Sequence, residues 1–314
     1  MRGAARAGLA LLALLAAGSC GPAIRPIARA LSDADTGMVW FETAERVVIS
    51  GLLAVPAGRG PFPAVMLLHG CSGLPSGTIE GWGPVLRGWG HATFVVDSFG
   101  GRGLSSVCRD ALRLLGTERI ADAYGALRLL VTHPRIDADR IALMGFSHGG
   151  IATLGSATEW ARATYGTPAA GASRGARFRA FLPFYPYCNA EVPDMVFGPA
   201  TPVRIHIGER DDWTPARTCV ALAAAARAAG GDVETTVYPD ARHSFDNVGL
   251  LTHTLWSADN AADCTPRLAS LRGPILNLLE LRRCMKKGAT VGHSPEATEQ
   301  ARLRVRAQLA DLLK

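Results

Sequence analysis

The chain has 314 residues, of which 48% are apolar and 19% charged, as in an ordinary globular protein. Its formal net charge of +6 is spread along the sequence without a Lys/Arg stripe or interleaved aromatic residues, which argues against a nucleic-acid-binding surface. No Pro/Ser-rich linker divides the middle of the chain, so the length favours one large α/β domain.

The first twenty residues, MRGAARAGLALLALLAAGSC, have the features of an export leader. Two arginines precede an apolar core over residues 9–17, which is too short to span a bilayer. Cleavage after Gly18 would release a soluble protein, whereas AGSC resembles a bacterial lipobox in which Cys20 carries a lipid anchor. We expect export in either case, to the periplasm, to the outer membrane as a lipoprotein, or out of the cell. Residues 21–37 are predicted to be a Pro/Ala-rich tether.

Residues 38–314 are predicted to form a single domain of alternating strands and helices. Short apolar runs such as AVMLLH at 64–69 are typical of strands buried on both faces of a parallel sheet. We predict strands over residues 38–41, 46–55, 64–69, 92–97, 140–146, 178–184, 203–207 and 233–238. We predict helices around Trp82 and over residues 118–131, 149–162, 215–229 and 295–313. The first two strands are expected to be an antiparallel pair, and the later alternation implies a mainly parallel sheet covered by helices on both faces.

The regular alternation stops after the last of these strands. Residues 244–293 contain a cysteine pair and a helical run over 275–281, but no strand pattern that can be recognised. We therefore predict that residues 244–293 are an insertion of loops and helix within the domain.

Six cysteines follow Cys20, and an exported protein is expected to oxidise them. An even set of six suggests three disulfides, although 15 pairings are possible and buried free thiols remain the alternative. Our prediction is that each disulfide ties a loop near the candidate site. The predicted pairs are Cys71–Cys108, Cys188–Cys219 and Cys264–Cys284.

The segment IALMGFSHGG, residues 141–150, combines an apolar strand, an abrupt turn and the start of a helix, with Ser147 at the tip. Only small residues two positions either side of the serine fit so sharp a turn, and the serine hydroxyl then stands clear of the sheet. A second GxSxG match surrounds Ser173, but it follows TPAA rather than a strand and precedes a strand-like run rather than a helix. We therefore interpret Ser147 as a nucleophile and Ser173 as part of a surface loop.

A serine nucleophile needs a base and an acid, and these should follow later strands at the same sheet edge. The strand at 203–207 runs into GERDDWTP, and the strand at 233–238 runs into PDARHSF. These loops supply Asp211 as the acid, with Asp212 as its alternative, and His243 as the base. The order Ser147, Asp211, His243 is that of α/β hydrolases.

Two backbone amides should stabilise the oxyanion of the reaction. The residue after the nucleophile supplies one, here His148 at a helix N-terminus, and the loop after the strand at 64–69 supplies the other at Cys71. A cysteine at position 71 has a role in a disulfide as its alternative. Aromatic side chains around the site are predicted to form an apolar wall that contacts the substrate: Phe184, Tyr185, Tyr187, Trp213 and Phe245.

The motifs LLHGCSG, VVDSFGGRG, MGFSHGG, GERDDWTP and YPDARHSFD occur in this order over about residues 60–246 and resemble the motif series of the dienelactone hydrolase family. The resemblance implies an α/β-hydrolase fold of about eight strands, no metal or organic cofactor, and hydrolysis of an ester or lactone. The namesake enzyme has a cysteine nucleophile, where this sequence has Ser147. Arg102 lies in the loop that resembles the one with a substrate-gripping arginine, so it is a candidate substrate contact, with loop bracing as the alternative.

The sequence thus predicts an exported serine hydrolase that cleaves a small carboxylic ester or lactone through an acyl-enzyme intermediate. The expected partner is a small-molecule substrate, with membrane contact only through a lipid on Cys20. A peptidase or acyltransferase of the same fold is one alternative, because a triad does not fix the acceptor. A non-catalytic exported binding protein on a hydrolase scaffold is the other.

Overall fold

A computed structural model describes residues 26–166 and 176–314. The predicted leader with Cys20, the start of the predicted tether and Ser173 lie outside the described residues. Within the described part of the chain, no helix is long and apolar enough to cross a membrane.

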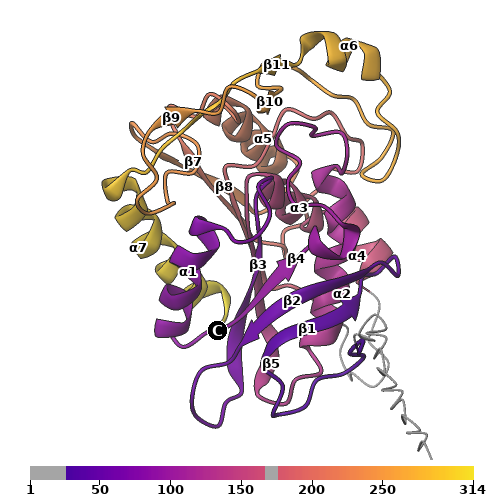
Figure 1. The fold of residues 1–314 in the computed structure, drawn as a ribbon, viewed down its shortest axis with the longest axis vertical. Helices are drawn as coiled ribbons and strands as arrows, with labels where there is room; N and C mark the ends of the chain where they lie inside the picture. Colours follow the sequence, from indigo (N-terminus) through magenta and orange to yellow (C-terminus); the bar gives the residue numbers. More distant parts are fainter. Residues whose placement is uncertain (1–25, 167–175) are drawn as a thin grey trace, which may run out of the picture.

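An eight-stranded sheet forms the centre of the domain, as the sequence predicts (Figure 1). The strand order is β1-β2-β4-β3-β5-β6-β7-β8, with β1 and β2 antiparallel to their neighbours and every later pairing parallel. The strands are β1 Gly37–Glu42, β2 Val48–Ala54, β3 Phe62–Leu68, β4 Ala92–Asp97, β5 Ile136–Phe146, β6 Ala180–Phe184, β7 Val203–Gly208 and β8 Val233–Tyr238.

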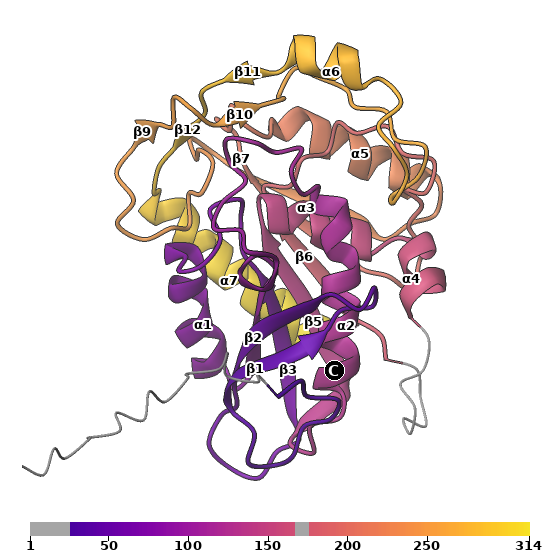
Figure 2. The ribbon, with the colours of Figure 1, turned by 45° about the vertical axis from the view of Figure 1, so that its right-hand side comes forward.

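Helices cover both faces of this sheet, with α1 and α7 on one side and α2, α3 and α4 on the other (Figures 1 and 2). Helix α5 packs against β8 and β7. The helices are α1 Gly77–Gly88, α2 Ile120–Leu130, α3 His148–Ser156, α4 Glu159–Tyr165, α5 Ala216–Ala228, α6 Leu278–Cys284 and α7 Pro295–Leu312. Two short 3-10 turns, η1 Gly100–Arg102 and η2 Gly116–Arg119, precede α2.

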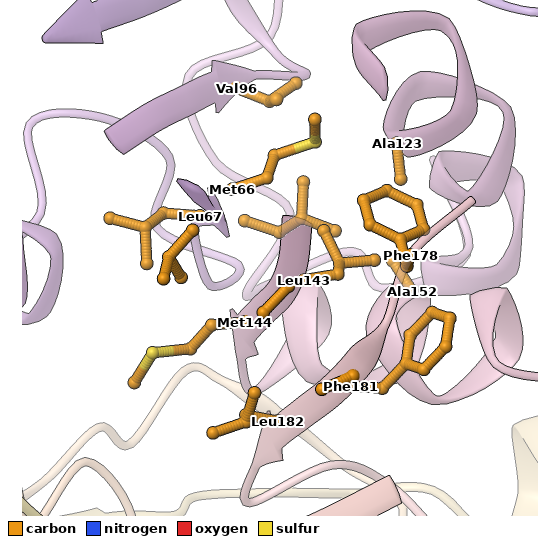
Figure 3. Packing of buried hydrophobic residues seen from close by; sticks show 14 of the residues in the cluster. Met66, Leu67, Val96, Ala123, Leu143, Met144, Ala152, Phe178, Phe181 and Leu182 are labelled. Carbon is orange, nitrogen blue, oxygen red and sulfur yellow. The ribbon is translucent and has the colours of Figure 1, made fainter. Parts of the chain in front are cut away.

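The central strands are buried on both faces because helices lie on each side of them. Leu143 and Met144, adjacent on β5, are fully buried and point to opposite faces, where they meet different layers (Figure 3). Phe178 and Ala152 lie on the side of Leu143, and Leu182 lies on the side of Met144 (Figure 3). This two-sided burial is why the strands read as continuous apolar runs in the sequence.

The helix predicted over residues 149–162 is two helices in the structure. Helix α3 ends near Ala157, and Thr158 begins α4 by accepting a hydrogen bond from the Ala161 amide (3.2 Å). A threonine oxygen that caps a new helix competes with continuation of the old one, which periodicity alone does not reveal.

The region predicted as an insertion lies beyond the carboxyl edge of the sheet (Figures 1 and 2). It holds α6 and four two-residue strands that pair as β10 with β11 and β12 with β9. No strand pattern was recognised here in the sequence. Strands of two residues are too short to show an alternating pattern. Their bounds are β9 His253–Thr254, β10 Asp259–Asn260, β11 Lys286–Lys287 and β12 Thr290–Val291.

Three disulfides join the predicted cysteine pairs, Cys71–Cys108, Cys188–Cys219 and Cys264–Cys284. The pairing prediction is confirmed, and the free-thiol alternative is wrong. Three disulfides are consistent with an extracellular or periplasmic protein.

Candidate active site

Ser147 occupies the sharp turn between β5 and α3. Its backbone has φ 53° and ψ −113°, a conformation that is costly for a residue with a side chain. The Ser147 amide donates to the Phe184 carbonyl at 2.9 Å, which holds the turn. A Cβ on Gly145 would lie 2.3 Å from the Gly149 carbonyl oxygen, and a Cβ on Gly149 would lie 2.3 Å from that of Leu68. The two glycines of the motif are therefore required by close backbone approach.

The structure brings Ser147, His243 and Asp211 into one hydrogen-bonded chain. The Ser147 hydroxyl lies 2.9 Å from His243 Nε2, and His243 Nδ1 lies 2.8 Å from Asp211 Oδ2. His243 and Asp211 are buried, whereas Ser147 is partly accessible. Since a carboxylate only accepts, Nδ1 carries the proton that His243 donates to Asp211, and Nε2 is left to accept from the serine hydroxyl.

Asp211 is held by the turn that follows it. Its Oδ1 accepts from the amides of Trp213 (2.9 Å) and Thr214 (2.8 Å), and its Oδ2 lies 2.9 Å from the Thr214 hydroxyl. Asp212 points away and accepts from the amide and hydroxyl of Thr290 at 2.8 and 2.6 Å. The geometry therefore pairs His243 with Asp211 and leaves Asp212 to contact the insertion.

Cys71 and His148, predicted to donate backbone amides to an oxyanion, line one cavity together with Ser147. Cys71 follows β3 by three residues, and His148 is the first residue of α3. Within the described part of the chain, neither amide donates to another protein group. The amide of a first helical residue has no partner within its own helix and lies at the positive end of the helix dipole, so the site suits a negative charge.

A fully buried arginine, which sequence reasoning missed, lies behind these two amides. Arg119 Nη1 donates to the His69 carbonyl at 2.8 Å and to His148 Nδ1 at 3.0 Å, so one guanidinium group bridges the β3 loop and the start of α3. The guanidinium carbon lies 5.2 Å from the ring centroid of Phe99. No described group accepts from the Nε or Nη2 of Arg119. Burial lowers the pKa of Arg119 to about 10, which still leaves it charged at neutral pH.

The two histidines beside Arg119 are neutral. Burial, reinforced by the Arg119 charge, lowers the pKa of His148 to about 3 and the pKa of His69 well below its usual value. His148 Nε2 donates to the Leu114 carbonyl at 2.8 Å, and His69 Nδ1 donates to the Gly70 carbonyl at 2.8 Å. Both rings therefore serve as fixed supports for the turns that carry the two amides, rather than as bases.

A second cluster that sequence reasoning missed, formed by Asp246, Trp82 and Tyr185, packs against His243. Asp246 is buried and accepts from the Trp82 indole at 2.7 Å and from the Tyr185 hydroxyl at 2.8 Å. Burial raises the pKa of Asp246, although both donors oppose this effect. The Tyr185 ring lies 4.6 Å from the His243 ring, centroid to centroid, so the cluster fixes a side chain that packs directly on the imidazole.

Two cavities open onto Ser147. The apolar cavity, of about 170 Å³, contains His148 and Ile151 in its wall, together with side chains from the insertion. The second cavity, of about 220 Å³, is mixed, and we call it the polar cavity because it is the more polar of the two. Its wall contains His243, Ser72, Thr78 and Asn247, together with the apolar Leu250, Leu255 and Val291. Cys71, Cys108, Ser147 and Trp213 border both cavities.

The predicted substrate contacts are only partly placed at these cavities. Trp213 borders both, Tyr185 borders the polar cavity, and Tyr187 borders the apolar one. Phe245 and Phe184 border neither and are fully buried in the core, so their predicted contact with substrate is wrong.

Arg102 also borders neither cavity. Its guanidinium pairs with both oxygens of the buried Asp122 carboxylate at 2.7 and 2.9 Å and donates to the Ser98 carbonyl at 2.6 Å. The substrate contact predicted for Arg102 is therefore wrong, and its bonds brace the loop after β4. The partner lies 20 residues along the chain on α2, which a loop resemblance does not indicate.

Comparison with known proteins identifies the family. The sequence profile described as the dienelactone hydrolase family matches residues 49–266, which is more than half of the chain. The chain belongs to the dienelactone hydrolase family. Membership makes it a hydrolase, and it confirms the family indicated by the sequence motifs.

Solved structures of this family and related folds are similar in backbone. A candidate dienelactone hydrolase from Klebsiella pneumoniae subsp. pneumoniae MGH 78578 superposes with a TM-score of 0.56 at 17% identity, over 87% of this chain and 99% of that one. Thermogutta terrifontis esterase 2, phosphorylated by paraoxon, gives a TM-score of 0.52 at 17% identity, over 69% of this chain and 87% of that one. At this identity the likeness shows the α/β-hydrolase fold.

One curated relative matches over a shorter stretch. The uncharacterized peptidase YtmA of Bacillus subtilis (strain 168) is 33% identical over 116 residues. This match spans 35% of the chain and 41% of the relative, so the chain covers about two fifths of that protein's length.

Proposed function

We propose that this member of the dienelactone hydrolase family is an exported serine hydrolase that cleaves a carboxylic ester or lactone. The observation that carries the proposal is the chain of hydrogen bonds from Ser147 through His243 to Asp211, at 2.9 and 2.8 Å. The Cys71 and His148 amides, which donate to no protein group among the described residues, lie near the same serine and supply the oxyanion contacts that acyl transfer requires.

In the acylation step, His243 Nε2 takes the hydroxyl proton as Ser147 Oγ attacks the ester carbonyl carbon. The carbonyl oxygen becomes an oxyanion that accepts from the Cys71 and His148 amides. The bond to the alcohol oxygen then breaks, and His243 returns its proton to that oxygen, so the alcohol leaves and the acyl group stays on Ser147. Asp211 stabilises the imidazolium that exists between these two proton transfers.

In the deacylation step, water replaces the alcohol beside His243. The imidazole takes one proton from the water as its oxygen attacks the acyl carbon, and the same amides bind the second oxyanion. The bond to Ser147 Oγ then breaks and the serine regains its proton, so an ester and water give an acid and an alcohol.

Export is supported by two independent features. Residues 1–20 have a short apolar core after two arginines, and three disulfides join the six remaining cysteines. Disulfides of this kind form and persist outside the reducing cytosol. Cleavage after Gly18 and lipid attachment at Cys20 are distinguished by the mass of the mature N-terminal peptide.

Covalent inhibition tests the serine assignment directly. Paraoxon phosphorylates Thermogutta terrifontis esterase 2, so the same reagent is a suitable probe here. We expect one diethylphosphoryl group per chain on the peptide that contains Ser147, and none on a Ser147→Ala variant of equal folding. Labelling of both proteins to the same extent, or labelling confined to the peptide with Ser173, would refute the proposal.

A peptidase is a second candidate, because the 33% identical relative is described as a peptidase. The same triad can acylate from an amide if the leaving nitrogen receives the proton of His243. A pair of substrates with one acyl group, a p-nitrophenyl ester and the matching p-nitroanilide, separates the two activities. We expect hydrolysis of the ester, and efficient hydrolysis of peptide anilides would favour the peptidase.

A further inference from the structure

The two cavities at Ser147 differ in which histidine lines them. His243 borders the polar cavity but not the apolar one, and His148 borders the apolar cavity but not the polar one. Ser147 borders both. Each cavity can therefore be matched to one substituent of the reacting carbon.

The chemistry of acyl transfer fixes this match. The tetrahedral carbon on Ser147 carries an oxyanion, a leaving oxygen and an acyl chain. The leaving oxygen must lie near His243 Nε2, because it receives its proton there, so the alcohol extends into the polar cavity. The oxyanion lies at the amides of Cys71 and His148. The acyl chain is then left with the cavity that begins at His148.

The wall of the apolar cavity suits such a chain. Ile151 on α3 and Leu115 before η2 line it together with Leu268, Leu281 and Met285 from the insertion. Two polar residues in this wall are engaged elsewhere, because Asp259 pairs with Lys287 and accepts from the Ala111 amide, and the Tyr187 hydroxyl donates to the carbonyl of Cys264 or Ala261. The cavity therefore offers mainly apolar surface to its occupant.

We propose that the preferred substrates are esters of an apolar acid with about six carbons beyond the carbonyl, linear or aromatic, whose alcohol lies in the cavity at His243. The inference rests on the proposed function and adds the substrate class. The length follows from the volume, since about 170 Å³ slightly exceeds the roughly 150 Å³ of an apolar protein cavity that binds benzene. Each buried methylene should raise kcat/KM about fourfold until the cavity is full.

Variants that resize the cavity in opposite directions test the assignment. Leu281→Ala removes a buried side chain from the wall, and Ala190→Phe adds a ring to it. The matched control is Leu279→Ala, on the same helix α6, because Leu279 is 71% exposed and borders neither cavity. Each variant is assayed with p-nitrophenyl esters of increasing acyl length and with acetate esters of alcohols of increasing length. Titration with paraoxon gives the fraction of reactive serine in each preparation.

We expect Leu281→Ala to move the optimum of the acyl series two or three carbons longer. Ala190→Phe should move it toward acetate, with a loss of at least tenfold on the heptanoate ester. The alcohol series should keep its order in both variants, and the control should match the wild type in both series. A shift in the alcohol series in place of the acyl series would overturn the orientation, and no shift in either would overturn the cavity assignment. Both results are distinct from failure of the proposed function, in which paraoxon leaves Ser147 of the wild type unlabelled.

Discussion

Removing the Cys71–Cys108 disulfide tests whether this crosslink positions the oxyanion loop as well as stabilising the fold. Cys71 carries one of the two amides assigned to the oxyanion, and its sulfur is bonded to a residue 37 positions later in the chain. The loop is also held by a hydrogen bond from the Val107 amide to the Cys71 carbonyl at 2.8 Å. The double variant Cys71→Ala/Cys108→Ala should therefore loosen the loop without releasing it.

The expected magnitudes follow from the loop length and from the chemistry. Closure of a 37-residue loop accounts for about 4 kcal/mol of chain entropy in the unfolded state, so the free energy of unfolding should fall by about that amount. Complete loss of one oxyanion donor costs roughly 10²–10³ in kcat. Because a backbone hydrogen bond still holds the loop, we expect a loss of about tenfold to a hundredfold.

The matched control is Cys188→Ala/Cys219→Ala. This pair closes a separation of 31 residues, so the same entropy argument predicts nearly the same loss of stability, again about 4 kcal/mol. Neither residue carries a group of the triad or an oxyanion amide, so kcat should stay within about threefold. Urea unfolding measures the first quantity and steady-state ester hydrolysis well below the melting temperature measures the second. Equal kcat values for the two double variants would refute a positioning role for Cys71–Cys108.

Three further outcomes are expected. Asp211→Asn should lower kcat about 10³–10⁴-fold, whereas Asp212→Asn, measured in the same ester assay, should lower it less than about threefold because only Asp211 contacts the imidazole. Gly149→Ala should lower kcat at least about tenfold, since its Cβ would meet a β3 carbonyl oxygen at 2.3 Å, and an unchanged rate would contradict the close approach. His206 on β7 is fully buried and His148 is also buried. Burial lowers the pKa of both histidines to about 3, below about 6.5 in the unfolded chain, so the unfolded state binds protons first as the pH falls. The free energy of unfolding should be independent of these two groups above about pH 6.5 and should fall by about 1.4 kcal/mol per pH unit for each histidine from there down to about pH 3. A urea midpoint that stays constant from pH 7 to pH 4 would disprove this coupling.

The parts of the site that were predictable follow from topology. Parallel strands bring the residues after their carboxyl ends to one edge, so the positions of Ser147, Asp211 and His243 in the sequence are enough to expect them together. The strand runs themselves were recognisable because helices bury both faces of the sheet. Asp211 and Asp212 are adjacent, so their side chains were expected to point in different directions, and Asp211 is the one that meets His243.

The parts of the site that could not be predicted depend on how deeply a side chain is buried and on hydrogen-bond partners far away in the sequence. Arg119 stands at the start of an amphipathic helix, where an arginine is usually exposed, and nothing local shows that it is fully buried beneath Phe99. Asp246 follows His243 by three residues, but its partner Trp82 lies 164 residues earlier in the chain. A charged residue next to a catalytic motif is a weak signal for such a cluster. Only the fold shows which groups donate hydrogen bonds to the buried carboxylate.

The turn after β7 connects His243 with the insertion beyond the carboxyl edge of the sheet. Asp211 orients His243, and the next residue, Asp212, binds Thr290 of the insertion through its carboxylate and Asn260 through its carbonyl at 3.1 Å. The following residue, Trp213, donates its indole proton to the Asp259 carbonyl at 2.7 Å. Three consecutive residues therefore contact both the His243 imidazole and the insertion. Because the insertion supplies much of the apolar cavity wall, these bonds fix the position of that wall relative to the His243 imidazole.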